Sequence, residues 1–312
     1  MVHQSQSKMV KHLLQISDVP AQDLKGLIQR GLEYKRTREL SGILGGKCLV
    51  LLFEKASTRT RMSFEVAVQE LGGATIFMTP SESQLGRSEP LKDTARVASG
   101  YVHGLIVRTF AQSILDELAQ QGAIPVINAL SDRFHPCQVL SDLLTISAHT
   151  PDFSDLTIAW VGDGNNMVHS WINAACFLPF ELRVATPKDY APDPEIIARA
   201  RDCGARLHLG HDPVQAVQGA DYINTDAWFS MGQEDEEQHR QQAFQGFQVN
   251  ADLVRKAKPE AGVLHCLPAH RGQEITDEVI EGRQSLVWEQ AANRLPMQKA
   301  VLEWIYSSYE SS

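Results

Sequence analysis

A short run of hydroxyl and guanidinium side chains, Ser-Thr-Arg-Thr-Arg at residues 57–61, is the part of the sequence best equipped for chemistry. It follows an apolar run at 48–53 and precedes a helical pattern at 62–71, so we expect a strand, a turn and a helix. Free backbone N–H groups and the positive dipole end at a helix N-terminus favour an anion, and guanidinium groups match phosphate oxygens. A lone stretch of this kind is also typical of a helix capped by Ser57 or Thr58 with surface arginines.

Polar or reactive residues follow apolar runs at several further points along the chain. They are Arg108, the His-Pro-Cys-Gln run at 135–138, the Gly-Asp-Gly-Asn-Asn run at 162–166, Asp226, and the His-Cys-Leu-Pro run at 265–268. Ligands of open parallel sheets bind beyond the carboxyl ends of the strands. So many coincidences are hard to attribute to separate turns, and they predict one shared site.

The elements that must position these residues are short apolar runs alternating with helical patterns. We expect strands at 47–54, 75–79, 104–108 and 124–128, and then at 156–161, 181–185, 206–209, 221–224, 262–267 and 285–288. Such alternation predicts an α/β fold in which each of two domains is a parallel sheet flanked by helices.

The switch between the two halves falls near 148–155, where Thr-Pro-Asp at 150–152 breaks the pattern. We therefore predict one domain at 1–148 and a second at 149–295, joined by interdomain helices. A last helical segment at 296–312 is expected to pack back on the first domain. The polar, acidic stretch at 233–242 is typical of a mobile loop.

Composition narrows the class of protein. The 312 residues carry a net charge of −9, which argues against a general nucleic-acid binder, and no apolar run is long enough to span a membrane. The N-terminal residues lack the apolar centre of a signal peptide. The five cysteines are scattered without zinc spacing, so we expect neither a disulfide framework nor a structural metal, and a reducing, cytoplasmic compartment.

Together, the motifs resemble those of the aspartate/ornithine carbamoyltransferases, from about residue 14 to the C-terminal helix. The Phe-Glu-Lys-Ala-Ser-Thr-Arg-Thr-Arg run at 53–61 matches the carbamoyl-phosphate loop of that family, with Ala56 in place of the usual proline. The run at 135–138 matches the second motif. The ornithine branch is marked by Asp226, Ser-Met-Gly at 230–232 and His-Cys-Leu-Pro-Ala at 265–269.

The resemblance implies transfer of the carbamoyl group from carbamoyl phosphate to the δ-amine of L-ornithine, giving L-citrulline and phosphate, with no cofactor or metal. It implies a role in arginine biosynthesis. It places on carbamoyl phosphate the residues Ser57, Thr58, Arg59, Thr60, Gln84, Arg108, His135, Gln138, Cys266, Leu267 and Arg294.

The resemblance places Asn166, Asp226, Ser230 and Met231 on ornithine. An amine resembling that of lysine arrives protonated at pH 7 and must lose a proton before it attacks. Asp226 can bind the ammonium, and a Cys266 thiolate is our hypothesis for the acceptor; the simpler interpretation of Cys266 is a small buried hydrophobe. The implied catalytic set is Arg59, Arg108, His135, Asp226 and Cys266.

The family also implies a homotrimer with shared active sites. The loop at 81–87 resembles the one that reaches into the neighbouring subunit, with Gln84 on carbamoyl phosphate, although composition alone favours a polar surface loop.

Three alternatives remain open. They are a carbamoyltransferase for putrescine or an N-acylated ornithine, a non-catalytic homologue that binds carbamoyl phosphate, and a dinucleotide-dependent dehydrogenase. The last is disfavoured because Met167 stands where a third glycine belongs.

Overall fold

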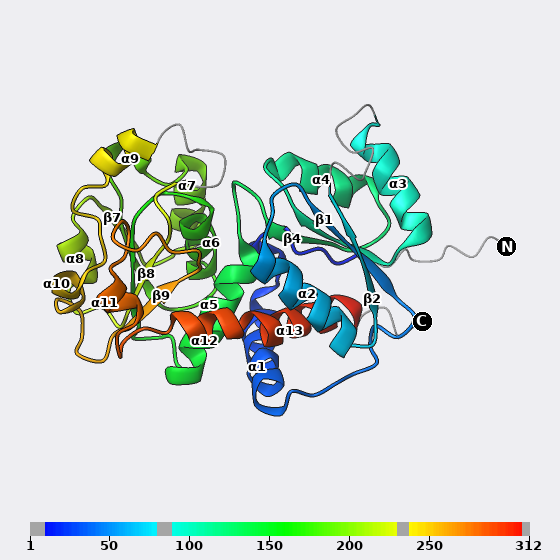
Figure 1. The fold of residues 1–312 in the computed structure, drawn as a ribbon, viewed down its shortest axis with the longest axis horizontal. Coiled ribbons are helices and arrows are strands. Elements are labelled where there is room, and N and C mark those ends of the chain that lie inside the picture. Colours follow the sequence, from blue (N-terminus) through cyan, green and yellow to red (C-terminus); the bar gives the residue numbers. More distant parts are fainter. Residues whose placement is uncertain (1–9, 80–88, 230–236, 308–312) are drawn as a thin grey trace.

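The computed structural model describes residues 10–79, 89–229 and 237–307, and it contains two parallel sheets side by side (Figure 1). The first sheet has the order β2-β1-β3-β4, with strands Ala74–Met78, Cys48–Phe53, Gly104–Arg108 and Val126–Leu130. The second has the order β7-β6-β5-β8-β9, with strands Leu207–Gly210, Glu181–Ala185, Thr157–Val161, Tyr222–Thr225 and Gly262–His265. The predicted α/β fold class is confirmed.

Helices cover both faces of the first sheet because the apolar side chains of its strands point alternately to one face and to the other. Leu49, Leu51 and Phe53 of β1 join the core under α1, α2, α5 and α13, whereas Val50 and Leu52 pack with α3 and α4. These helices are Ala21–Thr37 (α1), Thr58–Glu70 (α2), Leu91–Tyr101 (α3), Gln112–Gln121 (α4), Pro136–His149 (α5) and Arg294–Tyr306 (α13).

The second sheet is covered in the same way. Ile158 and Trp160 of β5 face α6 and α7, and Ala159 and Val161 face a separate core that includes residues of α8, α10 and α11. The helices of this half are Asn166–Ala175 (α6), Pro194–Asp202 (α7), Pro213–Val217 (α8), Glu237–Ala243 (α9), Ala251–Val254 (α10), Asp277–Ile280 (α11) and Val287–Ala292 (α12); short 3-10 turns lie at Ile16–Asp18 and Lys188–Tyr190.

The helices α5 and α13 join the two halves. All residues of α5 from Pro136 to Ser147 are buried, and α5 packs against α1, α13, α6 and α12 (Figure 1). One continuous apolar core therefore runs from the first sheet to the second. The helix α13 packs on α1 and α2, as expected for the last segment, although it begins at Arg294 rather than 296.

Two local predictions are wrong. The expected strand at 285–288 is absent; Ser285 makes only an isolated bridge to Val263, and the chain turns into α12, whose Val287 is fully buried. The expected loop at 233–242 is a helix from Glu237 onward, while its first residues lie outside the described part of the chain. Among the described residues, no helix is long and apolar enough to cross a membrane.

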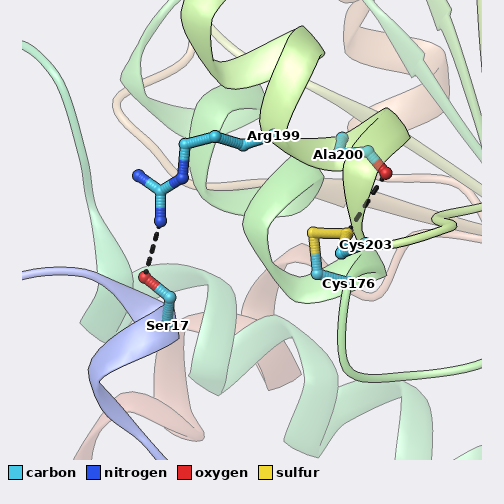
Figure 2. The surroundings of a disulfide bond; sticks show 5 residues. All are labelled: Ser17, Cys176, Arg199, Ala200 and Cys203. Atoms are coloured by element: carbon cyan, nitrogen blue, oxygen red, sulfur yellow. Dashed lines mark hydrogen bonds between the residues drawn. A yellow bond between two sulfur atoms is a disulfide. The ribbon is translucent and has the colours of Figure 1, made fainter.

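Cys176 and Cys203 form a disulfide, which corrects the expectation that the scattered cysteines remain unpaired (Figure 2). Cys176 follows the last turn of α6 and Cys203 follows that of α7. Because α6, β6 and α7 are consecutive parallel-crossover elements, both helices end at the same side of the sheet, and the two Cα atoms lie 5.6 Å apart. A separation of 27 residues gives no sign of this in the sequence.

Candidate active site

A pocket of about 440 Å³ opens between the two sheets, at the carboxyl ends of their strands. It brings together most of the residues that the sequence predicted for a site: Ser57, Thr58, Arg59, Thr60, Arg108, His135, Asn166, Asp226, Cys266, Leu267 and Arg294. Gln138 is not among the residues that line the pocket, and its side-chain oxygen accepts from Arg294, which does. Gln84, Ser230 and Met231 fall outside the described residues.

The turn after β1 forms one wall and caps α2. The Ser57 hydroxyl accepts the backbone N–H of Thr60 at 3.3 Å and donates to the Thr60 hydroxyl at 2.9 Å. This is the capping geometry that leaves the other N–H groups of the first turn free for an anion. Arg59 lines the pocket, whereas Arg61 is exposed, pairs with Glu65 and stacks on the Phe77 ring.

Arg108 stands beside this turn because of strand register. It pairs with Phe53 across β1 and β3, so the ends of both strands open into the same pocket. Only 6% of Arg108 is exposed, and its Nε has no hydrogen-bond partner among the described residues. Removal from water, together with the nearby Arg294 and Arg59 cations, lowers the pKa of Arg108 to about 10.

Arg294, the first residue of α13, lies at the back of the pocket. Its guanidinium donates to the Gln138 side-chain oxygen at 2.6 Å and to the Thr60 hydroxyl at 2.9 Å. The preceding Asn293 fixes the start of the helix by donating to the Thr145 hydroxyl of α5 at 2.9 Å. Burial, only partly offset by nearby acidic groups, lowers the pKa of Arg294. The pocket therefore gathers three guanidinium groups that an anion would neutralise.

His135 precedes α5 and is 4% exposed. Its backbone N–H donates to the Ser170 hydroxyl at 2.8 Å, and its Nδ1 has no partner in the described part of the chain. Removal from water, and then the cations of Arg294 and Arg108, hold the pKa of His135 well below its usual range. The imidazole is therefore neutral at pH 7 and offers one N–H donor.

The opposite wall comes from the second sheet. Register pairs Thr225 of β8 with His265 of β9, which sets Asp226 beside Cys266. The Asp226 carboxylate accepts the Cys266 thiol at 2.9 Å and the Asn165 amide at 3.0 Å. Removal from water, and then the Asp226 charge, raise the pKa of Cys266 well above its usual range. The free site thus contains a thiol, which disfavours the thiolate hypothesis in this state.

The chain from Cys266 to Pro268 has an unusual backbone. Leu267 has a φ of +58° and a cis peptide bond to Pro268, and its N–H donates to His265 Nδ1 at 2.9 Å. His265 Nε2 in turn lies 3.0 Å from the buried Glu274 carboxylate. Asp226, His265 and Cys266 offer potential metal ligands within 4.8 Å of one another. Both nitrogens of His265 are already engaged, so the cluster does not fit a metal well.

Several pocket residues were missed by sequence reasoning. Lys55 is 7% exposed, and its ammonium lies 2.5 Å from Asp132, which follows β4. Phe229 packs edge-on against His270, and both line the pocket. Lys55 stands inside the phosphate motif and could have been included on that ground, but Asp132 and His270 gave no signal of their own.

Comparison with known proteins agrees with this geometry. The family model described as aspartate/ornithine carbamoyltransferase, carbamoyl-P binding domain, matches residues 11–148, and its Asp/Orn binding domain counterpart matches residues 154–305. The ornithine carbamoyltransferase of Oleidesulfovibrio alaskensis is 57% identical over 297 residues, covering 95% of this chain and 99% of that protein. That of Nitratidesulfovibrio vulgaris is 55% identical over 299 residues, covering 96% and 100%.

Solved structures show the same fold. The ornithine carbamoyltransferase of Pyrococcus furiosus superposes with a TM-score of 0.89 at 43% identity, covering 94% of this chain and 96% of that one. The anabolic enzyme of Campylobacter jejuni gives a TM-score of 0.91 at 39% identity, covering 96% and 99%. Sequence motifs, pocket and relatives agree, and the chain belongs to the aspartate/ornithine carbamoyltransferase family.

Proposed function

We propose that this protein transfers the carbamoyl group of carbamoyl phosphate to the δ-amine of L-ornithine, giving L-citrulline and phosphate. One observation supports this most strongly: a cationic wall of Arg59, Arg108 and Arg294 faces the hydrogen-bonded Asp226–Cys266 pair across a single pocket. The cations suit a phosphate dianion, and the carboxylate suits an ammonium group. A biosynthetic role in arginine formation follows from the same resemblance and from the anabolic relative.

On the cationic wall, the hydroxyls and backbone N–H groups of 57–60, with Arg59 and Arg294, hold the phosphate. Arg108 and the neutral His135 donate to the carbonyl oxygen as it gains negative charge. One such positioned donor lowers a barrier by about 3 kcal/mol. The Gln138 side-chain oxygen already accepts from Arg294 and has a second lone pair for the carbamoyl NH2 group, as do the carbonyls of Cys266 and Leu267.

On the acidic wall, Asp226 binds the δ-ammonium of ornithine, and Asn166 contacts its amino-acid end. The Asn166 amide nitrogen is occupied by the Ser131 carbonyl at 2.6 Å, which leaves its oxygen free to accept from an ammonium. Because Cys266 remains a thiol, we assign it the hydrogen bond that orients Asp226. The ammonium gives one proton to solvent before it attacks, and after the C–N bond has formed the nitrogen gives a second proton to the phosphate oxygen as the C–O bond breaks.

The test is citrulline formation from carbamoyl phosphate and ornithine, with putrescine and N-acetylornithine assayed beside it. Of the three amines, we expect only ornithine to be carbamoylated. Arg59→Ala should lower kcat/KM by several orders of magnitude because it removes a charged phosphate ligand. Arg61→Ala is the matched control, since this neighbouring guanidinium is not part of the pocket lining and instead pairs with Glu65 and stacks on Phe77. Equal losses in the two variants, or turnover with putrescine instead, would refute the assignment.

We propose a homotrimer whose sites are shared between subunits. The edge strand β2 and the adjacent α2 expose Ile76 (46%), Met62 (60%) and Val66 (38%) beside the phosphate turn, an apolar face suited to a second copy. Gln84→Ala and Arg108→Ala chains are unfolded and refolded together in equal amounts. An intact site then needs Arg108 from a Gln84→Ala chain and Gln84 from a neighbouring Arg108→Ala chain. Each condition is met in about half of cases, so about one quarter of sites should be restored. Hybrid trimers with only the parents' residual activity would exclude shared sites.

We also propose the division into a carbamoyl-phosphate domain at 1–148, with α13 packed on it, and an ornithine domain at 149–295. We propose a cytoplasmic location on the composition of the chain and its scattered cysteines. Disulfides are rare in that compartment, so rapid alkylation of Cys176 in intact cells tests it. A thiol that reacts supports the cytoplasm, and an oxidised pair argues against it.

A further inference from the structure

Behind the pocket lies a carboxylate that the mechanism above does not use. Asp142, in the middle of α5, is fully buried. Its Oδ1 accepts the side-chain amides of Gln138 at 2.9 Å and Gln290 at 2.7 Å, and its Oδ2 lies 3.5 Å from the amide of Asn224. The three donors come from α5, α12 and β8, so one buried group collects amides from both halves of the molecule.

We propose that Asp142 is a positioning residue that sets the direction of the Gln138 amide and, through it, the head of Arg294. Asp142 Oδ1 accepts from two amides at once and is the acceptor oxygen whether or not Oδ2 carries a proton, so it requires the NH2 end of Gln138 to face it. The oxygen of Gln138 must then face Arg294, whose Nη1 lies 2.6 Å away. The reversed amide would set an NH2 group against a guanidinium, leaving buried donors without acceptors.

This orientation reaches the phosphate turn in one further step. The second Nη of Arg294 donates to the Thr60 hydroxyl at 2.9 Å. Every contact in the buried series Asp142, Gln138, Arg294 and Thr60 therefore pairs a donor with an acceptor. It also leaves the free lone pair of the Gln138 oxygen for the carbamoyl NH2, and this part of the inference rests on the proposed function.

The same carboxylate reaches toward the other wall. The Gln290 side chain that it holds accepts the backbone N–H of His265 at 2.9 Å, directly before Cys266. Asn224 lies two residues before Asp226 on β8. Asp142 is thus connected to the ends of the two strands that present the amine site.

A double-mutant cycle separates positioning from simple core stability. Asp142→Leu removes both acceptors at similar volume, and Gln138→Ala removes the group on which Asp142 is proposed to act. We expect Asp142→Leu to weaken carbamoyl-phosphate binding, measured calorimetrically, by about 10- to 100-fold. In the Gln138→Ala background the same change should weaken binding by less than about 2-fold. If the two substitutions weaken binding independently, so that their fold-changes in affinity multiply in the double variant, the proposal is wrong.

Conservative variants keep the test readable if Asp142→Leu does not fold. Asp142→Asn retains the oxygen that accepts both glutamines, and the Asn224 oxygen, unpartnered among the described residues, can turn to accept the new NH2; we expect it to recover most of the binding. Gln138→Glu alone sets two carboxyl groups together and should fail. Combined with Asp142→Asn it removes the repulsion between two carboxylates and should bind more tightly than Gln138→Glu. A double variant no better than Gln138→Glu would refute the proposal.

The matched control is Ser141→Ala, the buried neighbour on α5 whose hydroxyl donates only to its own helix, at the Cys137 carbonyl. Its affinity should stay within about 2-fold of wild type. The binding readout also separates the two hypotheses. A protein that binds carbamoyl phosphate but makes no citrulline refutes the proposed function, and the cycle still decides the role of Asp142.

Discussion

Replacing one of the clustered arginines should stabilise the ligand-free protein and at the same time lower its catalytic activity. In Arg108→Met, a buried cation becomes an apolar side chain of similar length. The pKa of Arg108 falls from its usual range to about 10, chiefly through removal from water and repulsion by Arg294. At 1.36 kcal/mol per unit, keeping this charge in the free site costs about 3 kcal/mol. We therefore expect the ligand-free variant to be as stable as wild type, or up to about 3 kcal/mol more stable.

Carbamoyl phosphate should reverse that order. A ligand at about 100 times its Kd adds about 2.7 kcal/mol to the free energy of unfolding of a protein that binds it. Wild type should gain this amount, and Arg108→Met should gain little because carbamoyl phosphate loses the guanidinium that donates to its carbonyl oxygen. The kcat/KM of the variant should fall at least about 1,000-fold, as expected when a charged donor to the reacting group is removed.

The measurement is urea unfolding followed by circular dichroism, with and without fresh carbamoyl phosphate. Arg183→Met is the control, because Arg183 pairs with Glu181 on the surface of the second half, at 2.5 Å. It should lose at most about 1 kcal/mol and keep the full ligand response. If Arg108→Met is destabilised without ligand by more than Arg183→Met, yet still responds fully to carbamoyl phosphate, the electrostatic reasoning is wrong.

Three further predictions concern titration and cross-linking. Burial raises the pKa of Asp142 to about 7, so its folded state holds a proton more tightly than the unfolded chain, and stability falls as pH rises from about 4 to about 7. Asp142→Asn should remove this pH dependence. In urea at pH 8, its free energy of unfolding should exceed that of wild type by up to about 4 kcal/mol, and near pH 4 the two should be equal. A difference that does not change with pH would contradict the assignment. Cys266→Ala should lower kcat but leave the rise in activity between pH 6 and 9 unchanged, because the thiol of the free site stays protonated there; a shifted profile would restore the thiolate hypothesis. Reduction of the Cys176–Cys203 bond, which closes a 27-residue separation, should lower the free energy of unfolding by about 3 kcal/mol, with Cys176→Ser insensitive to reductant; an equal response in that variant would exclude the bond as the cause.

The positions of the strands and of the pocket could be predicted largely because polar residues follow buried strands. The expected strands at 104–108 and 181–185 match β3 and β6 residue for residue. The expected strand at 124–128 lies two residues too early, because Pro125 precedes the ladder and the chain pairs from Val126. The error at 285–288 arose where an apolar run was too short to distinguish a strand from a helix start.

The sequence could not predict relations that depend on how several helices meet. Gln138 and Asp142 are four residues apart on one helix, a spacing at which their contact was foreseeable. The approach of Gln290 and Asn224 to the same carboxylate depends on the docking of α12 and β8 against α5. The Cys176–Cys203 bond depends in the same way on two helices ending side by side. In each case local patterns were consistent with the structure but did not specify the partner.

The helix α13 gives the phosphate site an unusual order of assembly during synthesis. It supplies Arg294 to a pocket whose other two guanidinium groups, Arg59 and Arg108, lie in the first half of the chain, and it packs on α1 and α2. Arg294 follows the end of α5 at His149 by 145 residues. At about 5–20 residues per second, a ribosome needs roughly 7–30 s to cross that interval. For that time the apolar faces of α1 and α2 that await α13 are open to chaperones, and the first sheet cannot complete its anion site before the second has emerged.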